Sequence, residues 1–432
     1  MRLRSCLNFS CLALLVLVAL SGWAFSEETN IVVGATNCLG NYPVVPTINQ
    51  ALSAVKGAKH AVIYVCPGIY SEQVVISQAL TLKGYNANSE AAAVIVPPAS
   101  GVVANTADLD TGLAIAAQVL VHNTAGPVTI TNLTIDGTGN GIADCNTDLQ
   151  GIRFENGSGT ANYVVTQNQI PGDIFSACAT GEGMVAQSSS GNSVVTFEDS
   201  SILNYNKNGI TVSDPNSKAT ITGNFVQGAG AAALAVQNGI QLGYGAKGSI
   251  SVNNVNGNNN AGPPYAADIL LIDAAENGGI SVNSNILGNS GLPIGLESDF
   301  ADAGEYGDGV TVTSNKIYGA STYDGIDVCT NGNTVTNNFI ANSVESGVHL
   351  DASCGTNYGG GTLFTGSSNT LSKNTILGGS CAGILQDTGT TDSIGAENYY
   401  TVPFTVTSST SSCTIPAGLA QARSKAKFSP KR

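Results

Sequence analysis

The chain has 432 residues, of which 52 are glycine and only 11% are charged. Abundant Val, Ile, Leu and Ala exclude a disordered chain, and the scarcity of charged residues and of Met argues against a helical bundle. The formal net charge is −14, and five of the 16 basic residues lie in the last ten positions. Nucleic acid is therefore not expected as a partner, because binding to phosphates needs clustered Lys and Arg.

Residues 1–26 read as a secretory signal peptide. Arg2 and Arg4 precede an apolar core at 11–20, and Ala24-Phe25-Ser26 is a small-x-small cleavage site. A retained N-terminal anchor is the alternative, although the apolar run is short for a membrane span. No second stretch is long and apolar enough to cross a bilayer. The sequence thus predicts a secreted, periplasmic or cell-surface protein without a membrane span after signal cleavage.

Eight cysteines remain beyond the signal, and an even number in an exported chain favours disulfides. We expect nearest neighbours in sequence to pair, although the sequence alone cannot choose among the possible pairings. No Cys-x-x-Cys motif occurs and no His lies near a Cys at zinc spacing, so no metal site is predicted at the cysteines. The eight are Cys38, Cys66, Cys145, Cys178, Cys329, Cys354, Cys381 and Cys413.

An irregular lead-in at 27–45 precedes the first predicted elements. Thr47 is a hydroxyl N-cap for a short helix that carries Ile48, Ala51, Leu52 and Val55 on one face. Alternating apolar segments bounded by Gly and Pro then predict strands. These segments are 61–65, 70–77, 80–83 and 93–96.

From about Thr129 a repeat dominates the chain. One marker is Gly followed by apolar-x-apolar, and it starts at Gly151, Gly209, Gly239, Gly325 and Gly347, with weaker copies at Gly183, Gly295 and Gly383. The other marker is Asn-x-apolar, and it starts at Asn168, Asn224, Asn285, Asn315, Asn338 and Asn374. Two markers that keep the same step of about 30 residues indicate a solenoid of parallel strands. A propeller is excluded because a blade needs four strands in about 40 to 45 residues, too many for this unit. Leucine-rich repeats are excluded because these units have no Leu at fixed offsets.

Stacked coils place equivalent residues about 4.8 Å apart in columns. Ile and Val columns then fill the interior, and Asn residues at one turn can pair amide to amide as a ladder.

The opening coil carries a family resemblance. The segment Thr47–Leu52, followed by Ile63-Tyr64-Val65-Cys66-Pro67-Gly68-Ile69-Tyr70 and by Leu80-Thr81-Leu82-Lys83-Gly84, resembles the first coil of the pectin-lyase-like superfamily of right-handed parallel β-helices. The Gly-Ile-x-Val and Asn-x-Ile units resemble the repeats of that superfamily. This resemblance covers roughly residues 45–400 and implies an all-β, single-stranded, right-handed parallel β-helix with a short N-terminal capping helix. We place the β-helix domain at 46–410 and expect the basic tail at 411–432 to be disordered. It does not imply one function, because the superfamily contains lyases, hydrolases, esterases, epimerases and non-catalytic surface proteins.

The second residue after each repeat Gly should point outward, because side chains alternate along a strand. The column of these residues contains three adjacent ionisable side chains, Glu297, Asp327 and His349. Neighbouring coils would place Glu297 and Asp327 about 5 Å apart, near the separation that retaining glycosidases use. We therefore predict these three as catalytic candidates, with His349 as a proton shuttle. The alternative is that all three simply face water.

Four further residues are candidates for substrate binding: Arg153, Gln241, Asp324 and Asp351. Arg153 is the only arginine between the predicted signal peptide and the C-terminal tail, and a surface ion pair is its alternative role. The acidic stretch 297–308 could hold calcium through oxygen ligands, although its spacing is not that of an EF-hand. A plain acidic loop is the alternative, and no other cofactor or metal is predicted.

Named enzyme families match only in pieces. Thr322-Tyr323-Asp324-Gly325-Ile326-Asp327 is similar to the Asn-Thr-Asp-Gly-Ile-Asp segment of polygalacturonases. Their Asp-Asp pair, Gly-His-Gly and Arg-Ile-Lys motifs are missing, and the next coil reads Ser346-Gly347-Val348-His349. Pectate lyases need an arginine base, for which only Arg153 is available between the signal peptide and the tail, and polyuronate substrates need cationic partners, which are scarce here.

The sequence therefore leaves two functions open. The first is an exported, non-catalytic scaffold that contacts a polysaccharide or a cell-surface glycan. The second is a carbohydrate-active enzyme, a polysaccharide hydrolase or lyase that works through the acidic patch. The sequence does not predict the oligomeric state.

Overall fold

The computed structural model describes residues 28–85, 92–172, 175–230, 233–259, 266–274, 279–297, 309–321, 323–352, 366–378, 382–401 and 405–407. The predicted signal peptide, the stretch 298–308 and the tail at 411–432 lie outside these residues. No helix within the described parts of the chain is long and apolar enough to cross a membrane.

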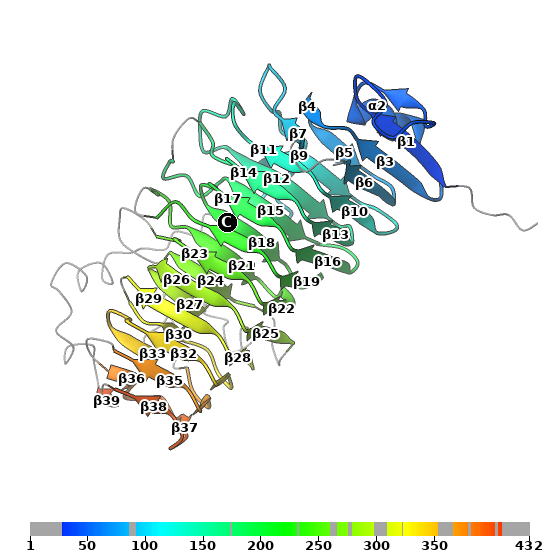
Figure 1. The fold of residues 1–432 in the computed structure, drawn as a ribbon. Helices are drawn as coiled ribbons and strands as arrows, with labels where there is room; N and C mark the ends of the chain where they lie inside the picture. Colours follow the sequence, from blue (N-terminus) through cyan, green and yellow to red (C-terminus); the bar gives the residue numbers. More distant parts are fainter. Residues whose placement is uncertain are drawn as a thin grey trace, which may run out of the picture.

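Three long parallel sheets run side by side along the molecule, and the chain visits them in turn as it advances (Figure 1). We call them sheets A, B and C, and the strands counted below for each sheet are those of the described residues. Each strand pairs with its equivalents one coil before and one coil after, which is the stacking that the repeat predicts. The expected parallel β-helix architecture is therefore confirmed.

Sheet A has fourteen strands in the spatial order β2 (Val44–Val45), β1 (Thr29–Val33), β3 (Ala61–Val65), β6 (Leu80–Gly84), β10 (Val128–Thr131), β13 (Gly159–Asn162), β16 (Ser193–Glu198), β19 (Ser217–Thr222), β22 (Lys247–Ser251), β25 (Ile280–Asn283), β28 (Thr311–Thr313), β31 (Thr334–Thr336), β34 (Thr370–Ser372) and β37 (Ser393–Ile394).

Sheet B has twelve strands: β4 (Gly68–Ser71), β7 (Ala93–Val96), β11 (Thr134–Asp136), β14 (Val165–Gln167), β17 (Ser201–Leu203), β20 (Phe225–Gln227), β23 (Asn254–Asn256), β26 (Ile286–Ser290), β29 (Lys316–Ala320), β32 (Phe339–Ala341), β35 (Thr375–Leu377) and β38 (Tyr399–Tyr400).

Sheet C has thirteen strands: β5 (Val74–Ile76), β9 (Ala114–His122), β12 (Thr147–Glu155), β15 (Glu182–Gln187), β18 (Asn208–Ser213), β21 (Asn238–Gly243), β24 (Ala267–Ile272), β27 (Leu292–Glu297), β30 (Ile326–Val328), β33 (Ser346–Leu350), β36 (Ala382–Asp387), β39 (Thr405–Thr407) and β8 (Thr106–Ala107), which is antiparallel to β9.

Helix α2 (Ile48–Ala54) is the helix predicted near Thr47. The Thr47 hydroxyl accepts a hydrogen bond from the Gln50 backbone N–H, so Thr47 is the expected N-cap. Ile48 and Ala51 are buried against the first strands.

One large apolar core fills the interior of the described coils. It is built from the columns that the repeat predicts: in sheet C, Ile294, Ile326, Val348 and Ile384 stack in register. All four are fully buried. The side chains between them on each strand point to the outer side of the sheet.

Buried asparagines form a ladder up the turn that follows sheet A. Asn315 Nδ2 donates to Asn338 Oδ1 at 3.0 Å, and Asn338 Nδ2 donates to Asn374 Oδ1 at 3.0 Å. The ladder comprises Asn224, Asn253, Asn285, Asn315, Asn338, Asn374 and Asn398. Asn168 was expected in it and is not, because Asn168 follows β14 of sheet B and lies at a different turn, where its amide donates to Asp136 and Thr138.

Two of the predicted disulfides are present, Cys38–Cys66 and Cys145–Cys178. Cys329 is also disulfide-bonded. Cys354, Cys381 and Cys413 lie outside the described residues, so the predicted pairing of Cys329 with Cys354 stays a prediction.

Candidate active site

Six ionisable residues gather on the outer side of sheet C near its C-terminal end. We call them the acid–histidine cluster, and they are Glu297, Asp324, Asp327, His349, Asp351 and Asp387. They come from four successive strands, β27, β30, β33 and β36, or from the residues beside these strands. Asp327 lies opposite His349 in the strand register, so the repeat brings the two together as predicted.

Glu297 does not occupy the predicted row. The strand register places Gly295 opposite Asp327, and Glu297 lies one outward position further along β27, opposite Ile272 of the preceding coil. The Gly295 copy of the repeat is offset by two residues, because Ile294 and Leu296 are the residues that enter the core. A side chain at Gly295 would come within 3.3 Å of Glu297 and Leu270, so the glycine leaves space there.

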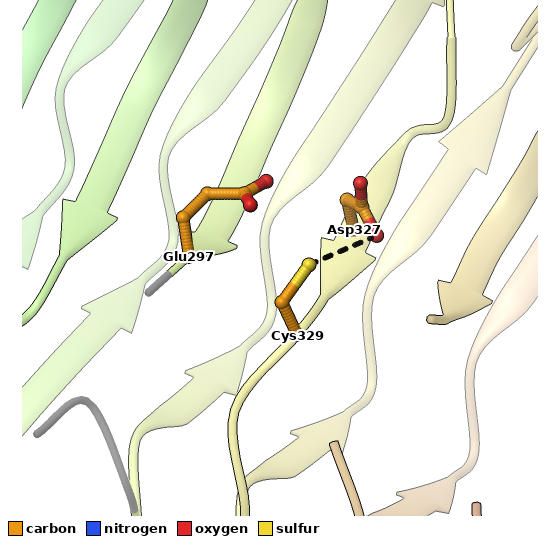
Figure 2. Close-up of side chains that lie close together, drawn as sticks. All are labelled: Glu297, Asp327 and Cys329. Carbon is orange, nitrogen blue, oxygen red and sulfur yellow. Dashed lines mark hydrogen bonds between the residues drawn. The ribbon is translucent and has the colours of Figure 1, made fainter. Parts of the chain in front are cut away.

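The offset still leaves the two carboxyl groups close to each other, as Figure 2 shows. One carboxylate oxygen of Glu297 and one of Asp327 lie within 4.8 Å of each other. Glu297 is half-buried, whereas Asp327 is only 9% exposed. Glu297 is thus the more solvent-accessible member of the pair.

Cys329 lies next to this pair but is not free to act as a ligand. Its sulfur is 3.8 Å from Asp327 Oδ1, the contact drawn in Figure 2. Because Cys329 is disulfide-bonded, its sulfur has neither a proton to donate nor a thiolate to offer to a metal.

His349 is fully buried between carboxylates. Its Nδ1 lies 3.3 Å from Asp324 Oδ2 and 4.0 Å from Asp327 Oδ1, and its Nε2 lies 3.4 Å from Asp387 Oδ1. Burial alone would lower the pKa of His349, but the negative charges of Asp324 and Asp351 and the contact with Asp387 outweigh it and raise that pKa well above the usual value.

The pKa values of two carboxyl groups near His349 are shifted in opposite directions. Burial and the negative charges of Glu297 and Asp351 raise the pKa of Asp327 well above its usual value, although His349 opposes this. Burial also disfavours ionisation of Asp387, but contact with His349 outweighs it and lowers the pKa of Asp387. One buried site therefore holds both a carboxyl that keeps its proton and a carboxylate.

The predicted binding residues Asp324 and Asp351 both belong to the cluster. Asp324 is fully buried, and its Oδ1 accepts hydrogen bonds from the Ser346 backbone N–H and hydroxyl. Asp351 is 8% exposed. Asp387 was missed, although it follows Gly383 at the spacing at which Asp351 follows Gly347. The repeat itself therefore contained the signal for Asp387.

The predicted binding residue Arg153 is not on the surface. It is 1% exposed, and its Nε donates to Glu155 Oε2 at 2.8 Å. Its Nη2 donates to Gln187, so Arg153 does form an ion pair, the alternative given above, but the pair is buried and not at the surface. Gln241 is half-buried, and its Oε1 accepts from the side-chain amides of Asn208 and Asn238.

Arg153 belongs to a second polar group on the same side of sheet C, several coils toward the N-terminus. We call it the amide network, and it consists of Asp148, Gln150, Arg153, Glu182, Asn208 and Thr211. Gln150 Nε2 donates to Asp148 at 2.7 Å and to Glu182 at 3.0 Å. Glu182 also accepts from Asn208 and Thr211, and Asp148 accepts from the Gly181 backbone N–H. Hydrogen bonds thus join all of its acidic groups to neutral donors.

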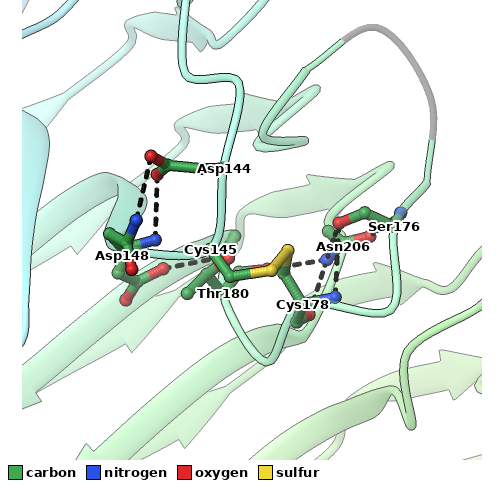
Figure 3. The surroundings of a disulfide bond; sticks show 9 residues. Asp144, Cys145, Asp148, Ser176, Cys178, Thr180 and Asn206 are labelled. Atoms are coloured by element: carbon green, nitrogen blue, oxygen red, sulfur yellow. Dashed lines mark hydrogen bonds between the residues drawn. A yellow bond between two sulfur atoms is a disulfide. The ribbon is translucent and has the colours of Figure 1, made fainter.

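The pKa values of the two carboxyl groups in the amide network are raised. Burial raises the pKa of Asp148 to about 6. Burial together with the charge of Asp148 raises the pKa of Glu182 to about 8. The disulfide Cys145–Cys178 braces the loops beside this network, and Asn206 donates to the backbone carbonyls of Cys178 and Thr180 there (Figure 3).

The acid–histidine cluster and the amide network are both more buried than the sequence pattern suggests. Outward side chains of a strand were expected to be solvated, yet Arg153, Asp327 and His349 are at most 9% exposed. For Arg153 part of the cause is visible: the segment around β8 crosses the outer side of sheet C. There Thr106 donates to Glu155, and the Leu109 backbone N–H donates to Gln187.

Comparison with solved structures supports the right-handed parallel β-helix fold. The chain is similar to the A-module of the Azotobacter vinelandii mannuronan C-5 epimerase AlgE6, with a TM-score of 0.50 and 16% identity over 83% of this chain and 93% of that one. It is also similar to the Agl-KA catalytic domain, with a TM-score of 0.53 and 12% identity over 83% of this chain and 64% of that one. No family model and no curated protein matches the chain. Identities this low show the fold alone.

Proposed function

We propose that this chain is an exported enzyme that hydrolyses a neutral polysaccharide, with Glu297 and Asp327 as its reacting carboxyl pair. The observation that carries the proposal is the distance between the two side chains, whose nearest oxygens lie within 4.8 Å. Retaining glycosidases hold their two carboxyl groups about 5–5.5 Å apart, because one group must attack the sugar carbon while the other protonates the leaving oxygen.

The exposure of the two side chains suggests which role each takes. Asp327 is the more buried, and a low-dielectric environment favours the protonated form of a carboxyl group, so it is the proton donor. Glu297 is half-buried and attacks the anomeric carbon, which forms a glycosyl ester and breaks the glycosidic bond. Water then hydrolyses the ester, and Asp327 takes the proton of that water.

Further observations support the substrate class and the compartment. Arg153 is engaged by Glu155, so the body offers little positive charge to a polyuronate, and a neutral glycan fits better. Two disulfides are typical of exported proteins, as is the predicted signal at 1–26. The fold is similar to that of the AlgE6 A-module, part of an enzyme named for mannuronan, which supports a polysaccharide as the substrate but does not bear on its charge.

Release of reducing sugar from a panel of neutral polysaccharides tests the proposal. Glu297→Gln and Asp327→Asn should each reduce release about 10²–10⁴-fold. Glu198→Gln is the matched control, because Glu198 also ends a strand, β16, but lies on sheet A. For the nucleophile, azide should restore cleavage of the chain by Glu297→Ala, measured as loss of polymer length, with a glycosyl azide in place of the new reducing end.

A non-catalytic scaffold is the second candidate, and the burial of the cluster favours it. Asp324 and His349 have no solvent exposure. Such burial is expected of an ion pair whose role is to stabilise the stacking of neighbouring coils. Binding of a glycan without release of sugar by the wild-type chain would support the scaffold and contradict the enzyme.

A further inference from the structure

On the side of His349 that faces Asp387, polar atoms have no hydrogen bond to the residues that the structure describes. Its Nε2 and Asp387 Oδ1 face each other at 3.4 Å, and neither has a hydrogen bond to any of the described residues. His349 is 0% exposed and Asp387 is 7% exposed, so bulk water has little access to hydrogen-bond either atom. Buried polar atoms in this state cost free energy unless another group binds them.

The separation of these atoms is informative. A charge-assisted N–H···O bond between an imidazolium and a carboxylate would be about 2.7–2.9 Å long. Two ligand atoms that each lie about 2.0–2.2 Å from one tetrahedral metal ion are about 3.3–3.5 Å apart. The 3.4 Å between Nε2 and Asp387 Oδ1 matches the second geometry.

A third ligand is within reach. Asp351 follows β33, the strand that carries His349, at the next outward position, and Asp387 ends β36, the next strand of sheet C. One ligand atom from each of His349, Asp351 and Asp387 lies within 4.8 Å of the others. All three side chains are at most 8% exposed.

We propose that His349, Asp351 and Asp387 bind a first-row divalent metal ion such as Zn²⁺. An imidazole nitrogen combined with two carboxylates suits Zn²⁺, Co²⁺ or Mn²⁺, whereas Ca²⁺ and Mg²⁺ prefer oxygen ligands alone. This site adjoins the Glu297–Asp327 pair, because His349 Nδ1 lies 4.0 Å from Asp327 Oδ1, but its ligands are different residues.

Asp324 supplies the supporting contact that such a histidine needs. Histidine ligands usually hold a carboxylate or carbonyl at the ring nitrogen that does not bind the metal. Asp324 Oδ2 lies 3.3 Å from Nδ1, and Ser346 fixes the other oxygen of Asp324 through two hydrogen bonds. Asp324 is therefore a positioning residue for His349 rather than a ligand.

The test is metal binding by the full chain, purified without a histidine tag and stripped with EDTA. Equilibrium dialysis against Zn²⁺, with metal analysis, should give one ion per chain. Co²⁺ should give the visible absorption of a tetrahedral complex, and Zn²⁺ should abolish it. The absence of saturable Zn²⁺ binding by the wild-type chain, or binding of Ca²⁺ in preference to Zn²⁺, would overturn the proposal.

Variants assign the site. Asp387→Asn should abolish saturable Zn²⁺ binding, and Asp324→Asn should weaken it about 10–100-fold. His122→Gln is the matched control, because His122 Nδ1 also lies 2.9 Å from a carboxylate, Glu155, but far along sheet C. Zn²⁺ affinity that is unchanged in Asp387→Asn, or lost in His122→Gln, contradicts the assignment. Because binding is measured without a glycan, failure of the proposed enzyme activity leaves this test unaffected.

Discussion

The amide network and the acid–histidine cluster lie on the same side of the same sheet, and both are buried. In the amide network, Gln150 donates to Asp148 and to Glu182, and Asn208 and Thr211 also donate to Glu182. In the cluster, charged groups face each other across 3.3–4.0 Å, and the two nitrogens of His349 have no hydrogen bond to the described residues.

This difference separates a structural role from a functional one. A polar network whose members are all hydrogen-bonded stabilises one arrangement of the chain. A buried cluster of like charges with incomplete hydrogen bonding is costly, and groups of this kind gather at sites that bind or react. We therefore assign stability to the amide network and chemistry to the acid–histidine cluster.

The largest effect on stability should come from the disulfide beside the amide network. Replacing Cys145 and Cys178 by Ser removes a cross-link between residues 33 positions apart. Loss of the constraint on the unfolded chain should cost about 3–4 kcal/mol. Urea unfolding of the double variant measures it. If zinc binding is lost while the fold is kept, the two regions are not independent.

Gln150→Ala should have the next largest effect. It removes the shared donor of Asp148 and Glu182 and an acceptor of Arg153, and it should lower the free energy of unfolding by about 2–3 kcal/mol. Urea unfolding gives the value. A loss below about 0.5 kcal/mol would show that the network does not stabilise the fold.

The amide network should also make stability depend on pH. The pKa of Glu182 is raised to about 8 from 4.5, so its contribution is complete below about pH 4.5 and is lost as the pH rises through 8. Asp268, whose pKa burial also raises to about 8, acts in the same direction. The free energy of unfolding should therefore fall between pH 5 and pH 8, and Glu182→Gln should reduce this slope. An unchanged slope in the variant contradicts the assignment.

Asp327→Asn should have the smallest effect on stability. It keeps the shape of the side chain and removes one acid from beside Glu297, Asp324 and Asp351, so the free energy of unfolding should stay the same or rise by up to about 1 kcal/mol. Thermal unfolding measures this. A loss of more than about 1 kcal/mol would place the cluster among the structural networks instead.

Strand repetition could be predicted from the sequence because the core columns repeat at every coil. Ile326 and Val348 fixed the register that brings Asp327 opposite His349. The Gly295 copy of the repeat predicts a register that differs by two residues from the structure, because this glycine faces outward and does not start the unit. Glu297 still reached Asp327, because a long side chain spans that offset.

The burial of outward side chains could not be predicted. Nothing in the local pattern around Arg153 shows that the segment near β8, about 50 residues earlier in the chain, crosses over Glu155. Asp387 was missed for another reason, since its repeat copy at Gly383 was weak and only its spacing from that glycine marks it. Local sequence patterns therefore do not reveal which distant segments cover a strand, and they give only weak signals for residues in degenerate repeat copies.

The most direct test of the assignment compares Asp327→Asn with Asp148→Asn. Both replace one buried acid of sheet C by its amide, and sugar release should be measured per folded molecule on the same neutral polysaccharides. We predict that Asp327→Asn loses release while its stability is kept, and that Asp148→Asn loses stability while release per folded molecule is kept. Equal loss of release in both variants, or loss only in Asp148→Asn, would contradict the account.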